Sequence, residues 1–130
     1  MGKKSPSVIV LDAGALIAFE KADAKMRALV REALHTQSRL IVPAGVVGQV
    51  WRDGARQVAL GALLRGPTTV VPPLDLPLAE ASGILCGRSG TSDVIDASVV
   101  LTARRERAAV VTSDIADLQR LDPTTTLHRI

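Results

Sequence analysis

Aromatic residues and cysteine are scarce in this 130-residue chain, and their scarcity narrows the classes of protein it can be. It has no tyrosine, one phenylalanine, one tryptophan and one cysteine, although 47% of its residues are hydrophobic. An internal disulfide is therefore impossible, and no cysteine and histidine cluster indicates a zinc site. Cys86 has no histidine nearby, so we expect a buried structural thiol. The core must be aliphatic, and the length suits one domain over residues 1–130.

The sequence also lacks a hydrophobic run long enough to cross a membrane, and its start does not resemble a secretory signal. The apolar stretches are interrupted by Asp12, by Pro43 and by glycines. We therefore expect a cytoplasmic protein with no membrane partner. The formal charge is +3, from 16 basic and 13 acidic residues. Arginine outnumbers lysine among the basic residues, and this balance permits a nucleic-acid partner without establishing one.

Short β-branched runs alternate with longer stretches whose apolar residues recur at helical spacing. The predicted strands are 8–11, 39–42, 68–71, 109–112 and 125–129. The predicted helices are 22–35, 43–51, 55–64, 78–86 and 93–105. Apolar strands between helices predict a three-layer α/β/α fold around a parallel sheet of four to five strands. The common doubly wound order 3-2-1-4-5 would make the first and fourth strands neighbours.

Two aspartates follow the strands that this order brings together. Asp12 comes directly after the first strand, and Asp114 comes two residues after the fourth. Ligands of such sheets bind at the carboxyl ends of the strands, where the strand order reverses, so the two carboxylates would share one crevice. Each aspartate also stands where a helix N-cap belongs, and for either residue alone capping is an equally good interpretation.

Asp93 and Asp96 form a third acidic element at the start of the helix predicted over 93–105. They are three residues apart, so both project from nearly the same helical face. The helix dipole accounts for Asp93, whereas Asp96 adjoins an apolar run and is less easily explained as a surface residue. Carboxylates that converge without histidine or cysteine suit Mg²⁺ or Mn²⁺. A site of that kind activates water and supports in-line displacement at phosphorus.

The ordered set of motifs resembles the PIN domain family, specifically the VapC-type toxin ribonucleases of bacterial VapBC toxin–antitoxin pairs. Four segments carry the resemblance: Val-Ile-Val-Leu-Asp12-Ala-Gly-Ala-Leu-Ile-Ala, Ile-Val-Pro43-Ala, Asp93-Val-Ile-Asp96-Ala and Val-Val-Thr112-Ser-Asp114-Ile-Ala-Asp117-Leu. Together they span nearly the whole chain. The resemblance implies a three-layer PIN fold and a metal-dependent endoribonuclease that a cognate antitoxin neutralises.

The same resemblance assigns roles to the acidic residues. Asp12, Asp96 and Asp114 would hold Mg²⁺ or Mn²⁺, and Asp93 would assist catalysis as a fourth carboxylate. The supporting positions would be Gln49, Thr112, Ser113 and Asp117. The Thr112 and Ser113 hydroxyls would orient a carboxylate or water, whereas Asp117 is more readily explained as a solvated helix residue. The implied partners are an RNA substrate, a VapB-like antitoxin and a second copy of the chain in a homodimer.

Gln49 departs from the family pattern, which usually has glutamate at this position. An amide oxygen can ligate a hard cation or hydrogen-bond to water, but it supplies no negative charge and cannot act as a base. Asp93 would then restore the missing charge. The alternative interpretation is a catalytically impaired PIN-like module that binds RNA or protein.

Three arginines are weaker candidates for contacts with RNA. Arg52 and Arg56 would lie one helical turn beyond Gln49 and line the crevice, although a surface pair without a role is equally plausible. Arg88 lies in the segment 87–92, which we interpret either as a flexible phosphate-binding loop or as an ordinary connection before a helix capped by residue 91 or 92. We expect Trp51 in the core or at a protein interface, because no second aromatic accompanies it.

Overall fold

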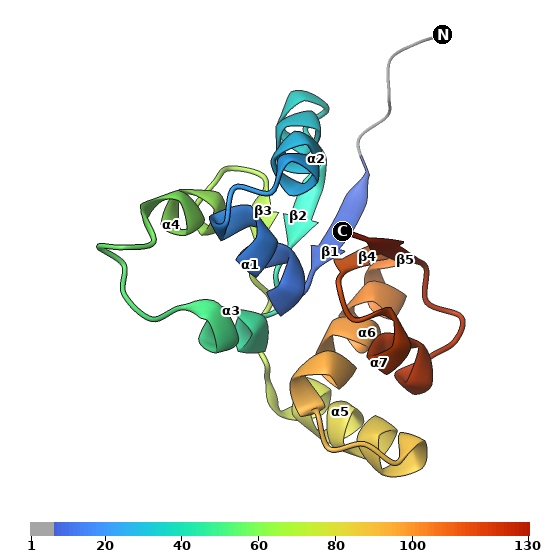
Figure 1. Cartoon of the computed structure of the whole chain (residues 1–130). Helices are drawn as coiled ribbons and strands as arrows, with labels where there is room; N and C mark the ends of the chain where they lie inside the picture. The colour runs from blue at the N-terminus through green and yellow to red at the C-terminus, as the bar shows by residue number, and fades with distance from the viewer. Residues whose placement is uncertain (1–6) are drawn as a thin grey trace, which may run out of the picture.

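The computed structural model describes residues 7–130 and shows an α/β fold on a five-stranded parallel sheet (Figure 1). The strands are β1 (Val8–Leu11), β2 (Arg39–Ile41), β3 (Thr69–Val70), β4 (Ala109–Thr112) and β5 (Leu127–Arg129). Their order is β3-β2-β1-β4-β5, which confirms the predicted topology. β1 is therefore central, and the strand order reverses between β1 and β4.

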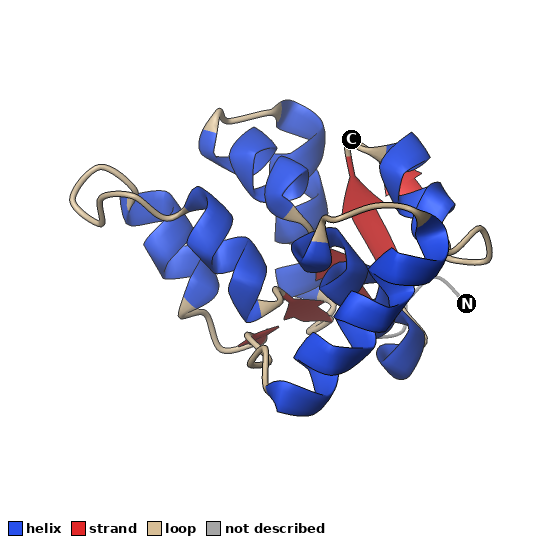
Figure 2. Ribbon diagram, turned by 90° about the horizontal axis from the view of Figure 1, so that it is seen from below, coloured by secondary structure: helices blue, strands red, loops and turns tan. Residues whose placement is uncertain are grey.

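Within residues 7–130, seven helices connect the strands. They are α1 (Ala13–Glu20), α2 (Ala24–His35), α3 (Ala44–Val50), α4 (Val58–Leu64), α5 (Leu76–Ser89), α6 (Val94–Glu106) and α7 (Ile115–Leu121). Helices α1, α2 and α4 form one layer against the sheet, and α6 with α7 forms the other, while α5 packs along α6 (Figures 1 and 2). None of these helices is long and apolar enough to span a membrane.

The buried core is aliphatic, as the composition requires. Val10 and Leu11 of β1 pair with Val110 and Val111 of β4, and all four side chains are at most 2% exposed. Strands this uniformly buried are typical of a parallel sheet covered on both faces. Cys86 is also buried, which confirms the prediction of a structural thiol.

Aspartate side chains begin four of the described helices. Asp12, Asp23, Asp75 and Asp93 each accept a hydrogen bond from the amide three residues ahead, at 2.8–3.1 Å. Such caps satisfy an amide group that the first helical turn leaves without a partner. The structure corrects one prediction, because α6 is capped by Asp93 itself and not by residue 91 or 92.

The segment between α3 and α4 is a turn where the sequence predicts helix. The side chain of Gln57 holds this turn: its Oε1 accepts from the amides of Arg52 and Asp53, at 2.7 and 3.0 Å, and its Nε2 donates to Val50 O and the Glu20 carboxylate. The helix predicted over 55–64 therefore begins only at Val58, and the helix predicted over 43–51 ends at Val50.

The segment 87–92 is not a flexible loop. Residues 87–89 form the last turn of α5, which ends at Gly90. Gly90 has φ 68°, the left-handed conformation that glycine adopts without strain. The structure therefore favours the second interpretation, an ordinary connection of only a few residues before the capped helix α6.

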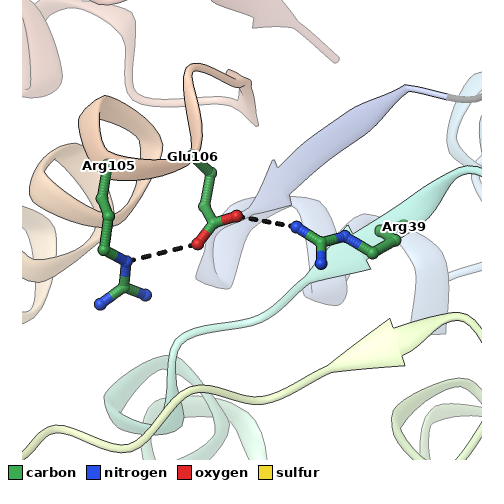
Figure 3. Close-up of polar contacts among 3 residues, drawn as sticks. All are labelled: Arg39, Arg105 and Glu106. Atoms are coloured by element: carbon green, nitrogen blue, oxygen red, sulfur yellow. Dashed lines mark hydrogen bonds and ion pairs between the residues drawn. The ribbon is translucent and has the colours of Figure 1, made fainter.

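Two sets of ion pairs tie α6 to its neighbours at the end of the sheet where β1 begins. Glu106 accepts from Arg39 at 2.8 Å and from Arg105 at 3.3 Å, on the surface (Figure 3). Exposed pairs of this kind contribute little to stability. Asp122 is buried and accepts from Arg104 at 2.8 Å and from the Thr124 amide at 2.9 Å. Burial alone would raise the pKa of Asp122, but hydrogen bonds from the Thr124 hydroxyl, from Arg104 and from the Thr124 amide outweigh it and lower the pKa to about 2.

Asp122→Asn should destabilise the protein by about 1–2 kcal/mol at pH 7, because it weakens charged hydrogen bonds at a buried position. The folded pKa of about 2 lies below the ordinary value of 3.8, so the stabilisation is present above pH 3.8 and is lost as the pH falls through 2. Urea unfolding at neutral pH and near the folded pKa measures the difference between the two proteins, which should shrink in acid. Glu106→Gln is the control at an exposed pair and should cost less than about 1 kcal/mol. A deficit of Asp122→Asn that does not change with pH would contradict this explanation.

Candidate functional site

The pairing of β1 with β4 brings Asp12 and Asp114 to the same edge of the sheet. Leu11 is in register with Val111, and the Asp12 amide donates to Val111 O at 3.4 Å. Asp12 therefore lies beside the last residues of β4, and Asp114 lies just beyond them. This edge is the carboxyl end of the strands at the point where their order reverses, which is where the sequence predicts a site.

The Asp12 carboxylate is buried and fixed. Its side chain is 4% exposed, and its Oδ1 caps α1 by accepting from the Ala15 amide at 3.0 Å. Burial raises the pKa of Asp12 above its ordinary value, and the charge of Asp114 raises it further. Hydrogen bonds from the Thr112 hydroxyl and from the Ala15 amide oppose this shift. Asp12 therefore caps α1 and also lies at the edge of the sheet where the sequence predicts a site.

The pKa of Asp96 is raised by burial and by the charges of the three other predicted acids. Burial raises the pKa of Asp96 to about 7, with further contributions from Asp93, Asp12 and Asp114. Asp93 acts both through its charge and through a hydrogen bond, and its Oδ1 also accepts from the Asp96 amide at 2.9 Å. The four predicted acids therefore lie near this edge of the sheet, close enough for the other three to raise the pKa of Asp96, and we call them the acid cluster: Asp12, Asp93, Asp96 and Asp114.

Asp114 occupies the N-cap position of α7, but its side chain makes no capping hydrogen bond. Its own amide donates to Thr112 Oγ1 at 2.8 Å. The Thr112 hydroxyl, which is fully buried, therefore accepts from the main chain of Asp114 and donates to the carboxylate of Asp12. One hydroxyl joins the two acids, and the Asp114 carboxylate stays available at the surface.

Two glycines let the surrounding helices close around the acid cluster. A Cβ on Gly14 would collide with Ser113 Oγ, so glycine allows the start of α1 to lie against the turn after β4. A Cβ on Gly45 would collide with Ile95 Cδ1, so α3 can approach α6 directly beside Asp96. The sequence analysis missed both residues; the only signal was a glycine in the first turn of each helix.

The remaining predicted residues lie outside the acid cluster. Gln49 is exposed on α3, one turn beyond Gly45, and within residues 7–130 no hydrogen bond joins it to a clustered acid. Asp117 is exposed on α7, and its charge is not among those that raise the pKa of Asp12 or Asp96. Ser113 is exposed in the turn that packs against Gly14.

The predicted arginines do not form one helical face. Arg52 follows the end of α3, and its Nη1 donates to Gly48 O at 3.1 Å and to Trp51 O at 2.7 Å. Arg56 lies in the turn held by Gln57 and is 88% exposed at the side chain. Arg88 lies in the last turn of α5. The helical spacing predicted for residues 52 and 56 is therefore wrong, because α3 ends before them.

The acid cluster suits a divalent cation in donor type and charge. Its four side chains offer only carboxylate oxygens, the ligands that Mg²⁺ and Mn²⁺ prefer. Burial is the largest cause of the raised pKa values of Asp12 and Asp96, and the charges of neighbouring acids add to both shifts; a cation would relieve that repulsion. In the described part of the chain, no three acidic, histidine or cysteine side chains are close enough to ligate one ion.

Comparison with known proteins gives a family match and several structural matches. The PIN domain family matches residues 9–122. Comparison with curated proteins gives no match. VapBC2 from Rickettsia felis, in a crystal structure with a DNA fragment from its promoter, aligns at TM-score 0.69 with 16% identity, over 95% of this chain and 98% of that chain. FitAB bound to an IR36 DNA fragment aligns at TM-score 0.62 with 15% identity, over 93% and 94%. FitAcB from Neisseria gonorrhoeae aligns at TM-score 0.62 with 18% identity, over 92% and 95%.

Asp96→Asn should stabilise the metal-free protein, and the gain should grow as the pH rises from acid to neutral. The folded pKa of about 7 lies above the ordinary value of 3.8, so ionisation of Asp96 costs folding free energy that accumulates as the pH rises between these values. We expect a gain of about 1–2 kcal/mol above neutral pH, after allowance for solvent screening. Urea unfolding in EDTA on either side of this range measures it, with the exposed Asp117→Asn as control. Equal gains at acid and alkaline pH would show that the cost of ionising Asp96, through burial and repulsion, is not the cause.

Proposed function

The chain belongs to the PIN domain family, and on that premise we propose that it is a toxin-type endoribonuclease dependent on Mg²⁺ or Mn²⁺. The proposal is supported by the position of Asp12 and Asp114 at the carboxyl ends of β1 and β4, with Asp96 of α6 near enough that both acids contribute to its raised pKa. A cluster of carboxylates without histidine or cysteine favours metal-assisted hydrolysis of a phosphodiester over acyl transfer, which would need a nucleophile and a base.

In this proposal, Asp12, Asp96 and Asp114 would hold the cation. A divalent cation bound there would lower the pKa of water and stabilise the charge that develops on the phosphate. The Asp12 carboxylate is buried and is oriented without a cation, because it accepts hydrogen bonds from the Ala15 amide and the Thr112 hydroxyl. Thr112 also holds the main chain of Asp114, and is therefore a positioning residue.

Asp96 and Asp93 have different proposed roles. The pKa of Asp96 of about 7 means that this carboxyl can gain or release a proton near neutral pH when no cation is present. An adjacent cation would favour its ionised form and so would lower the pKa. Asp93 is held as the cap of α6, so its carboxylate contributes negative charge from a fixed place beside Asp96.

Gln49 supports a second candidate, a PIN-like module that binds RNA or protein but cuts poorly. The resemblance to the family places glutamate here, and this chain has an exposed amide without a hydrogen bond to the acid cluster in the described residues. We favour the nuclease, because Asp93 supplies a fourth carboxylate next to Asp96. The two candidates differ in what a restored glutamate would do.

We also propose two protein partners, a VapB-like antitoxin and a second copy of the chain. The similarity of fold to VapBC2 supports the antitoxin. Several large apolar side chains remain exposed, among them Leu76 and Ile84 of α5, at 70% and 58%. Apolar side chains at such exposure are typical of surfaces that another protein covers, and they support association with a partner.

Purified protein should cut single-stranded RNA only with Mg²⁺ or Mn²⁺, and EDTA should stop the reaction. Asp114→Asn should lower the rate about 100-fold or more, because it removes a charge that faces the developing transition state. Asp117→Asn is the matched control, an exposed aspartate one turn further along α7, and should cut at the wild-type rate. Cleavage that persists in EDTA, or in Asp114→Asn, would contradict the assignment.

Asp93→Asn should reduce cleavage while leaving α6 intact, because asparagine caps helices as well as aspartate does. If Asp93 replaces the missing glutamate charge, Gln49→Glu should restore the rate of Asp93→Asn and change that of the wild type less than about threefold. Rates of the two single variants and the double variant with Mn²⁺ measure this. A sharp rise for Gln49→Glu alone would instead favour the impaired binding module.

A further inference from the structure

Trp51 lines a pocket that the proposed chemistry does not use. The pocket has a volume of about 290 Å³ and lies between the ends of α3 and α4. Its lining residues are Val47, Trp51, Leu64, Arg65 and Val71. Trp51 is the only tryptophan of the chain and is partly buried, so it is neither in the core nor fully exposed. No second aromatic accompanies Trp51 in the sequence, but the side chain of Arg65 lies over its ring.

The ring of Trp51 is held at the side of this pocket. A Cβ on Gly54 would lie 3.1 Å from Cζ2 of the ring, and a Cβ on Gly61 would lie 3.3 Å from Cη2, so both glycines make room for it. The Arg65 guanidinium lies over the ring, 5.6 Å from its centroid, and Nη1 donates to Gly61 O at 3.3 Å. The pocket thus combines a fixed aromatic ring, aliphatic walls and a cation.

A second arginine lies over an aromatic ring elsewhere, and it provides a comparison. Arg27 is 4.1 Å from the centroid of the Phe19 ring, but Phe19 is only 6% exposed. Phe19 and Arg27 also line a pocket, of about 360 Å³, but so little of the Phe19 ring is exposed that it offers a ligand a much smaller face. The Trp51 ring lies at a more open site and is the better candidate for stacking.

The pocket lies at the same edge of the sheet as the acid cluster, on the other side of α3. Val71 directly follows β3, just as Asp12 directly follows β1. Gly45 of α3 contacts Ile95 beside the acid cluster, whereas Val47, which lines the pocket, projects from roughly the opposite side of the helix, about 200° around its axis. From Gly45 to Trp51 the helix rises only about 9 Å.

The surface of α3 between the acid cluster and the pocket has no side chain at Gly48 and carries the positive charge of Arg52. A Cβ on Gly48 would meet no atom within 4 Å, so no side chain stands in the way at this position. Arg52 lies against that surface, with its Nη1 donating to Gly48 O. Within residues 7–130, neither Arg52 nor Arg65 is paired with a carboxylate. An anionic chain could therefore cross α3 and meet both cations.

We propose that this pocket binds a nucleobase of the RNA substrate, stacked on Trp51 and contacted by Arg65, while Arg52 contacts the phosphate chain where it crosses α3. The inference rests on the proposed nuclease function and adds a substrate subsite to it. Single-stranded RNA is typically bound by stacking of unpaired bases on aromatic rings and arginine planes, with basic side chains along the backbone. The two unpaired arginines favour this ligand over an apolar protein segment.

The single tryptophan allows a direct test, because all tryptophan fluorescence comes from the pocket. Asp114→Asn protein without divalent cations is titrated with a short single-stranded oligouridylate, and Trp51 fluorescence is recorded. Binding is measured independently as the anisotropy of a labelled copy of the same RNA. We expect quenching with the same midpoint as the anisotropy change. An abasic ribose-phosphate chain of equal length should bind about tenfold more weakly and should not quench.

Variants separate stacking from folding. Trp51→Leu should weaken RNA binding about tenfold, and Trp51→Phe, which keeps an aromatic face, should stay within about threefold of the parent. Arg65→Gln leaves the ring in place and should also weaken binding. Arg27→Gln, at the closed Phe19 ring, is the matched control and should bind RNA normally. Thermal unfolding of each variant shows that the fold is kept.

The outcomes distinguish this inference from the function on which it rests. One outcome would be RNA binding, detected by anisotropy, that does not quench Trp51 and is equally strong in Trp51→Leu and Arg65→Gln. That outcome would overturn the nucleobase subsite and leave the nuclease proposal intact. The pocket would then be a surface for a protein. Failure of the parent to bind RNA, together with failure of the wild type to cut it with Mg²⁺ or Mn²⁺, would overturn both.

Discussion

Repulsion among carboxylates is the interaction that the rest of this structure has to accommodate. Four aspartates from three parts of the chain lie near one edge of the sheet, and the charges of neighbouring acids add to the rise that burial gives the pKa values of Asp12 and Asp96. Such an arrangement opposes folding when no cation is present. The fold tolerates this repulsion because the buried aliphatic side chains of β1 and β4 stabilise the strands that precede Asp12 and Asp114. The aliphatic core is thus the condition for the site.

Local hydrogen bonds reconcile two interpretations that the sequence leaves open. Asp12 and Asp93 cap helices, and both also belong to the acid cluster. Asp114 stands at a cap position without capping, and Asp96 lies a turn inside α6. Two of the acids cap helices, and all four leave their charge near this edge of the sheet. A cap is therefore no argument against a role in chemistry, because one carboxylate has two oxygens.

Sequence reasoning predicted the sheet order from the common doubly wound topology, and it predicted the edge of the site from the aspartates that follow two apolar runs. It failed where one side chain controls the backbone at a distance. The turn before α4 depends on Gln57 contacting Glu20, and no local pattern encodes that contact. Helix α5 continues through Gly87 because its packing on α6 outweighs the low helix propensity of glycine. The stacking of Arg65 on Trp51 is likewise tertiary, so a search for neighbouring aromatics could not find it.

The central position of β1 also determines when, during synthesis of the chain, Asp12 and Asp114 can come together. Ile9 of β1 is in register with Ala109 of β4, so the two halves of the site are made about a hundred residues apart. A growing chain that has produced β1, β2 and β3 holds Asp12 without the strand that places Asp114 beside it. Contacts so distant in sequence form late and slowly. The order of the strands thus delays any activity until β4 has left the ribosome.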